Sequence, residues 1–123
     1  MIEYEWDNNM MTYEFDPKAS VIHLRASGIL IASDPISYFE AIDNDPSFIP
    51  KAEEHIYFTD LDDIQFSYND ITKIGEAFAR FNHGDKITKG IFIVDNDLSY
   101  GMARMIMAIF EGVFTHFEIK RID

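Results

Sequence analysis

Five aspartates stand at the carboxyl ends of two strand-like segments: Asp60, Asp62, Asp63, Asp95 and Asp97. If the two strands are parallel neighbours, these carboxylates lie at the edge where open α/β sheets bind ligands. Mg²⁺ and Ca²⁺ prefer such hard oxygen ligands. The candidate metal ligands are Asp60, Asp62, Asp95 and Asp97. Alternatively, each aspartate bonds backbone amides of its own turn or helix start.

Ser67 is the second residue whose position allows chemistry. It opens the segment 67–70 (SYND), where a serine with an acid three residues later is typical of a capping box at a helix start. The same hydroxyl is a candidate phosphoacceptor. We expect the capping role and keep phosphorylation as the alternative.

The segment 98–113 is the longest predicted helix, about 24 Å at 1.5 Å per residue. Two apolar stripes run along it: Leu98, Met102, Met105 and Ile109, and Ala103, Met107, Phe110 and Phe114. A surface helix normally has one such stripe, so we expect the second to be covered by another helix, a partner chain or an amphiphilic ligand. Packing against the two shorter helices is the alternative. The candidate ligand-binding residues are Tyr100, Met102, Arg104, Met107 and Phe110.

No catalytic motif is present in the sequence. The four histidines show no metal-binding i, i+4 spacing and are expected on strand surfaces or at helix ends: His23, His55, His83 and His116. No G-x-S-x-G, P-loop or G-x-G-x-x-G sequence occurs, and the absence of cysteine excludes disulfides and zinc–thiolate sites. We therefore predict a binding role rather than catalysis, with no cofactor.

The composition is that of one folded domain of 123 residues, with 47% hydrophobic residues. A net charge of −12 disfavours nucleic acids and anionic membranes, and favours basic partners. Neither a signal peptide nor an apolar run near the ~18 residues of a membrane span is seen. We expect a bacterial cytoplasmic protein without stable membrane insertion. Candidate partners are a regulatory protein, a second copy in a homodimer, and an amphiphilic small molecule.

Alternating strands and helices predict an α/β fold of order ββαβαβαβ. An opening hairpin (11–15 and 21–27) makes the largely parallel sheet mixed, and the helices pack on the sheet. The later strands are placed at 55–61, 91–94 and 115–122.

Several boundaries follow from single residues. Gly28 is expected to end the hairpin and Gly84 the second helix, while Ser33 is expected to cap the first helix. The mostly apolar strand 55–61 is expected to be covered on both faces. Residues 1–9 are an N-terminal extension or an edge strand, before a single domain at 10–123.

Two regions resemble a known family. The strand ending Phe-Thr-Asp-Leu at 58–61, the strand Ile-Phe-Ile-Val at 91–94 and the helix start Tyr-Gly-Met-Ala-Arg-Met at 100–105 resemble the SpoIIAA-like branch of STAS domains, the anti-sigma-factor antagonists. The segment 44–48 (NDPSF) also resembles the family. The resemblance implies a SpoIIAA-like fold related to SEC14-type lipid-binding domains, and a regulatory protein–protein role.

The sequence departs from that family at two places. Relatives of the sporulation type carry an Asp-Ser-Ser-Gly-like loop whose serine a partner kinase phosphorylates. Here the position falls on Asn69 or Asp70, two or three residues after Ser67. The helix that follows the final strand in many relatives is missing before Asp123. Our first reading is a regulatory protein-interaction module; the alternatives are an amphiphile carrier with an apolar groove beside 98–113, and a metal-dependent site at the aspartates.

Overall fold

The computed structural model describes residues 3–5, 11–114 and 116–123. Six strands form a sheet in the order of the chain: β1 (Glu3–Glu5), β2 (Met11–Asp16), β3 (Val21–Ile31), β4 (Ala52–Gln65), β5 (Ile87–Val94) and β6 (Phe117–Arg121). The pairs β1–β2 and β2–β3 are antiparallel, and the pairs from β3 to β6 are parallel. The expected mixed α/β sheet is confirmed.

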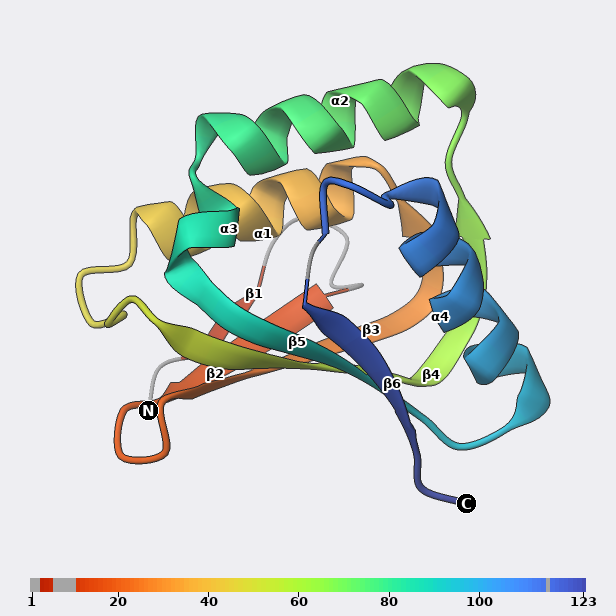
Figure 1. Cartoon of the computed structure of the whole chain (residues 1–123), viewed down its shortest axis with the longest axis horizontal. Helices are drawn as coiled ribbons and strands as arrows, with labels where there is room; N and C mark the ends of the chain where they lie inside the picture. The colour runs from red at the N-terminus through yellow and green to blue at the C-terminus, as the bar shows by residue number, and fades with distance from the viewer. Residues whose placement is uncertain (1–2, 6–10, 115) are drawn as a thin grey trace.

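The helices of the described residues all lie on one face of this sheet (Figure 1). They are α1 (Ser33–Asp43), α2 (Tyr68–Arg80), α3 (His83–Lys86) and α4 (Asp97–Ile109). Each crossover from β3 to β6 steps to the next strand in the same direction, and right-handed crossovers of this kind leave their helices on one side. The expectation that 55–61 is covered on both faces is therefore wrong, and burial alternates along the first half of β4.

The N-terminal segment supplies the edge strand β1. Glu3–Glu5 pairs antiparallel with β2, with Tyr4 opposite Tyr13. The other residues of the stretch 1–9, including Ile2 and Trp6, lie outside the described residues. At the opposite edge of the sheet stands β6.

The strand β3 is longer than predicted because Gly28 does not end it. Gly28 has a φ of 67°, in the left-handed region that glycine tolerates, and the register with β4 shifts between Gly28 and Ile29. Such a bulge bends a strand without ending it. β3 therefore continues to Ile31, and β4 follows it to Gln65, well beyond the last β4–β5 pair at Tyr57.

Two helix boundaries also differ from the prediction. Asn82, with a φ of 51°, turns the chain from α2 directly into the short helix α3, so Gly84 lies within α3 instead of stopping α2. Ser33 makes no capping bond at the start of α1. The fully buried carboxylate of Asp34 instead accepts a hydrogen bond from the backbone amide of Ile31, 2.9 Å away.

The helix α4 ends at Ile109 and carries a single buried stripe. The residues buried along it are Ser99, Met102, Ala103 and Ile106. Leu98 and Met105, from the first predicted stripe, are 59% and 40% exposed, so the prediction of two covered stripes is wrong. No helix in the described ranges, α4 included, is long and apolar enough to cross a membrane.

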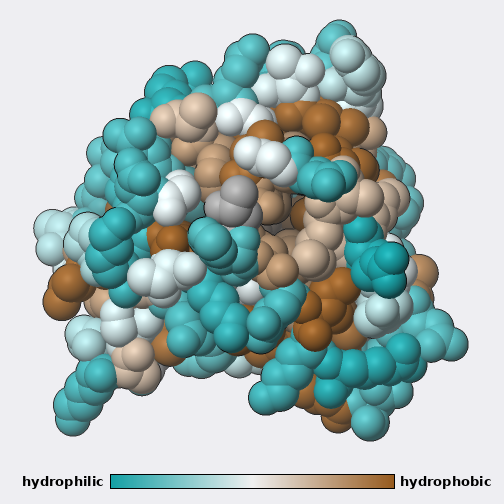
Figure 2. All heavy atoms as spheres, viewed as in Figure 1, coloured by the Kyte–Doolittle hydropathy of each residue, from teal (hydrophilic) through white to brown (hydrophobic). Residues whose placement is uncertain are grey.

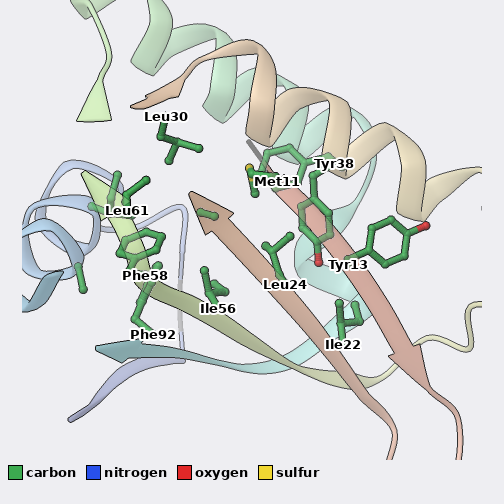
Figure 3. Close-up of a cluster of buried hydrophobic side chains, with 14 of the residues drawn as sticks. Met11, Tyr13, Ile22, Leu24, Leu30, Tyr38, Ile56, Phe58, Leu61 and Phe92 are labelled. Carbon is green, nitrogen blue, oxygen red and sulfur yellow. The ribbon is translucent and has the colours of Figure 1, made fainter. Parts of the chain in front are cut away.

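The core fills the space between the sheet and the helices. Figure 3 shows Tyr38 reaching from α1 toward the sheet and Tyr13 rising beside it from β2; their ring centroids are 5.6 Å apart. Side chains from the central strands complete this cluster: Ile22, Leu24, Ile56, Phe58 and Phe92.

Candidate functional site

A carboxylate is buried on the helix-covered face of the sheet. Glu54 alternates with Ala52 and Ile56 along β4, so it points toward the helices, and it is only 3% exposed. Tyr38 of α1 and His83 of α3, each 1% exposed, both contact it. A buried ionised carboxylate is costly unless it is hydrogen-bonded, and these two contacts offset that cost. We call Tyr38, Glu54 and His83 the buried triad.

Both partners of Glu54 bond the same oxygen. Nε2 of His83 lies 2.7 Å from Oε2 of Glu54, and the Tyr38 hydroxyl donates to the same atom. Burial, followed by the charge of Glu54, raises the pKa of Tyr38 well above its usual value. The phenol therefore keeps its proton and acts as a donor.

The imidazole of His83 is enclosed by aromatic rings. The ring centroids of Tyr38, Phe39 and Phe78 lie 5.3, 4.7 and 5.5 Å from that of His83. The proton on Nε2 is assigned from its bond to Glu54, since an ionised carboxylate can only accept. The buried Nδ1 atom has no hydrogen-bond partner among the described residues. His83 is thus held by one strong bond and by packing.

An apolar cavity of about 60 Å³ adjoins the buried triad. Side chains of β2 to β6 and of α1, α2 and α4 line it, and nearly all of them are aliphatic or aromatic. Glu54 and Tyr38 supply the polar groups of this lining. Figure 2 shows a hollow with an apolar rim beside α4, in the same region of the molecule.

One wall of the cavity is a stack of three phenylalanines. Phe110 and Phe114 stack with centroids 4.7 Å apart and planes 17° apart, and Phe114 stacks on Phe117 at 5.3 Å. Phe78 of α2 meets Phe114 at 4.9 Å. All four residues line the cavity. This wall therefore consists of aromatic rings from α2, from β6 and from the connection between α4 and β6.

The predicted ligand-binding residues of α4 are split between the cavity and the surface. Phe110 lines the cavity and is 2% exposed. Met102 is buried in the core, and the half-buried Met107 packs against it. Tyr100 and Arg104 contact each other instead, with the guanidinium donating to the tyrosine hydroxyl at 3.2 Å. Of these five residues, the structure places Phe110 alone at the cavity.

The predicted metal ligands do not form one group. β4 leaves β5 after Tyr57 and continues along β3, and this extension carries Asp60 and Asp62. Asp95 lies at the turn into α4, and Asp97 accepts a 2.9 Å bond from a guanidinium of β6. Within the described ranges, no three histidine, aspartate or glutamate side chains could together hold a metal ion. The prediction of a cation site here is therefore wrong.

Ser67 caps α2, as the sequence predicts. Its hydroxyl accepts a bond from the amide of Asp70 at 3.1 Å, and the carboxylate of Asp70 accepts one from the amide of Ser67 at 2.9 Å. These hydrogen bonds lower the pKa of Asp70. The exposed hydroxyl is thus engaged as an acceptor at the helix start, and phosphorylation there stays a prediction.

Replacing Ser67 with alanine removes this cap and is expected to lower the free energy of unfolding by about 1 kcal/mol. Urea unfolding measures the change. Ser33→Ala is the matched control, because Ser33 opens α1 without a capping bond and its loss should cost less than about 0.5 kcal/mol. Equal losses in the two variants would contradict the capping role.

The helix-free face of the sheet carries a second polar cluster. The rings of His23 and His55 are 5.5 Å apart, and Nδ1 of His23 lies 3.0 Å from the hydroxyl of Tyr57. The guanidinium of Arg25 sits 4.4 Å over the Tyr57 ring. Burial, then His55 and Arg25, lowers the pKa of His23. His23 and His55 are thus strand-surface residues as expected, whereas His83 is buried.

The sequence analysis selected neither Tyr38 nor Glu54 as a candidate site residue, and it placed His83 only on a strand surface or at a helix end. One signal was present, because the alternation of β4 gives Glu54 an inward position between apolar neighbours. Its partners have no local signature: Tyr38 and His83 are 16 and 29 residues away in the sequence. Only the packing of α1 and α3 on the sheet brings them together.

No protein-family model matches the chain, and no curated protein is significantly similar to it. Among solved structures, it is similar to an uncharacterised protein of the DUF3478 family with a SpoIIAA-like fold from Shewanella loihica PV-4. The two chains are 19% identical, the match covers 92% of this chain and 84% of the other, and the TM-score is 0.52. The chain therefore has the SpoIIAA-like fold that the sequence resemblance predicted. Identity this low shows the fold alone.

Proposed function

We propose that this chain binds a small apolar or amphiphilic molecule in the cavity between its sheet and its helices, and does not catalyse a reaction. The observation that carries the proposal is the cavity of about 60 Å³, whose surface is almost wholly apolar. Protein interiors are close-packed, with few voids larger than a water molecule. Apolar pockets with a few converging polar groups are the usual form of small-molecule sites.

The position of the cavity also supports binding rather than a packing defect. An empty apolar void forfeits dispersion contacts along its whole lining. Here that lining is rich in large aromatic rings, including Phe110 and Phe114, and it also contains a carboxylate. A small apolar ligand in the cavity would restore dispersion contacts along this lining.

The proposal is tested with xenon, a small apolar probe that binds in apolar protein cavities, and its binding is followed by the NMR shifts of nearby methyl groups. Ile106 lines the cavity, and Ile106→Phe fills part of it. Met105→Phe is the matched control, because the adjacent Met105 faces solvent. We expect Ile106→Phe to weaken xenon binding by about tenfold, since 1.4 kcal/mol of lost contact has this effect, and Met105→Phe to leave it unchanged. Equal binding by the wild type and both variants would place the xenon elsewhere and contradict the proposal.

A regulatory protein-interaction role is the second candidate. It is supported by the exposed apolar residues Leu98 and Met105, which lie on the outer side of α4. The charge of −12 favours a basic partner. Leu98→Asp should then abolish capture of one basic protein from a bacterial lysate while Ile106→Phe does not. Capture that is insensitive to Leu98→Asp would contradict this role for α4.

A further inference from the structure

We propose that two copies of this chain associate through the edge strand β6, which pairs antiparallel with the β6 strand of the second copy about a two-fold axis at Ile119. The partner is thus the same protein, and the two sheets join into one continuous sheet. This edge is separate from the cavity, so the inference does not depend on the proposed function.

The outer side of β6 is open to another chain. Among the described strands β6 pairs with β5 alone, and in Figure 1, where β6 is dark blue, no described segment lies across its outer side. An edge strand presents unpaired N–H and C=O groups that can pair with a further strand. Proline and bulges normally prevent such pairing, and β6 has neither. The backbone of this edge is therefore available for a partner strand.

The hydrogen bonds to β5 show which backbone groups of β6 are free. The carbonyl of His116 accepts a bond from an amide of β5 at 3.1 Å, and the amide of Ile122 donates to a carbonyl of β5 at 2.9 Å. Successive residues of a strand direct their backbone groups to alternate sides. The even-numbered residues of this segment therefore bond β5. The residues whose N–H and C=O groups point outward are Phe117, Ile119 and Arg121.

An antiparallel copy centred on Ile119 pairs all of these outward groups. Ile119 lies opposite Ile119 of the partner subunit, and Phe117 lies opposite Arg121 of the partner subunit. Each such pair exchanges two hydrogen bonds, about six in all. A copy shifted by one residue would instead place the outward groups opposite residues whose backbone groups already bond β5. The backbone thus allows the centred register and registers shifted by two residues.

The charges of β6 select the centred register among these. Glu118 then lies opposite Lys120 of the partner subunit on both sides of the axis, in pairs whose side chains are close together. A shift of two residues in either direction would place Glu118 opposite its own copy, or Lys120 opposite its own copy, and like charges opposite each other are destabilising. Both side chains are exposed, and Lys120 has no ion-pair partner among the described residues. A charged edge usually resists pairing, but the alternating signs make this edge complementary to its own reverse.

The first test is the mass of the full chain in solution as a function of its concentration, measured by sedimentation equilibrium. Salt at about 0.15 M limits the repulsion between two chains of charge −12. One strand pair is a small interface, which is typical of weak complexes. We therefore expect dimers at about 100 µM protein that dissociate at about 1 µM. A monomer over this whole range overturns the inference.

Charge reversals show whether β6 forms the interface. In Lys120→Glu both ion pairs become like-charge pairs, and the dimer should weaken by about tenfold or more. Glu118→Lys should have the same effect, although it also loses the pair with Lys89 at 3.1 Å. A mixture of the two variants restores both pairs and should give mixed dimers, which also shows that each variant is folded. Lys18→Glu is the matched control, because Lys18 lies in the exposed turn between β2 and β3. Dimers that persist in Lys120→Glu place the interface elsewhere and contradict the inference.

Amide hydrogen exchange, followed by NMR, tests the backbone pairing itself. The outward amides of Phe117, Ile119 and Arg121 should exchange more slowly as the protein concentration rises. The amides of Glu118 and Lys120 bond β5 in each copy and should change less. If the protein dimerises but exchange at Ile119 stays the same at all concentrations, the two copies do not pair through this strand.

Discussion

Replacing His83 with leucine is expected to lower the free energy of unfolding by about 3–5 kcal/mol, a large part of the stability of a small domain. Leucine fits the apolar surroundings of the His83 ring, so the loss is electrostatic rather than steric. Glu54 would remain at 3% exposure with one hydrogen bond fewer. Equilibrium unfolding in urea measures the change.

The double variant Glu54→Leu/His83→Leu is the control for this prediction. Once the carboxylate is removed, the imidazole is no longer required, and buried ion pairs replaced by apolar residues often cost nothing. We therefore expect the double variant to be more stable than His83→Leu alone. Equal or greater loss in the double variant would show that His83 acts by packing and not by holding the charge of Glu54.

This expected pattern bears on the role of the buried triad. If apolar residues at positions 54 and 83 are nearly as stable, the fold does not need a carboxylate inside its core. A polar group kept at such a position is more easily understood through binding than through stability.

Gly90→Ala is expected to lower the free energy of unfolding by about 1–3 kcal/mol. Gly90 in β5 is paired with Phe117 in β6, and a Cβ atom at Gly90 would overlap the Phe117 ring. That ring is held from the other side by Phe92 and Phe114, with centroids 5.7 and 5.3 Å away. It therefore cannot move aside freely. Urea unfolding of the variant measures the loss.

Two further variants separate crowding from the general effect of an added methyl group. In Gly90→Ala/Phe117→Leu the smaller side chain makes room for the Cβ atom, and much of the lost stability should return. Gly101→Ala adds the same methyl group in α4 where no atom lies within 4 Å, and it should stabilise by about 0.5–1 kcal/mol. A Gly90→Ala protein as stable as the wild type would mean that the Phe117 ring is free to move.

The periodicity of the sequence was sufficient to predict the types of the elements and the mixed sheet. The predicted boundaries were wrong where a single residue is compatible with two different local structures. A glycine often ends a strand. Gly28 instead stays within β3 in a left-handed conformation, at a register shift between β3 and β4. The four-residue helix α3 is too short for any hydrophobic period.

The candidate site was less predictable than the fold. The apolar residues of α4 could be sorted into stripes only by an assumed rotation, and Ile106, which belonged to neither predicted stripe, is the one that lines the cavity beside Phe110. The aspartates were grouped on the assumption that β4 and β5 end together. Instead β4 extends past β5 along β3, with register shifts whose extra residues lie on β4, and such tertiary details set the register of a sheet.

The strand order has a consequence for synthesis. Every strand pairs with its neighbour in the chain, so each new strand finds its place at the edge of the sheet that already exists. Each strand can join the sheet as it leaves the ribosome, since domains form from the N-terminus during translation. The last strand, β6, brings Phe117 to the cavity wall. The nascent protein can therefore complete most of its sheet before the aromatic wall of the cavity is in place.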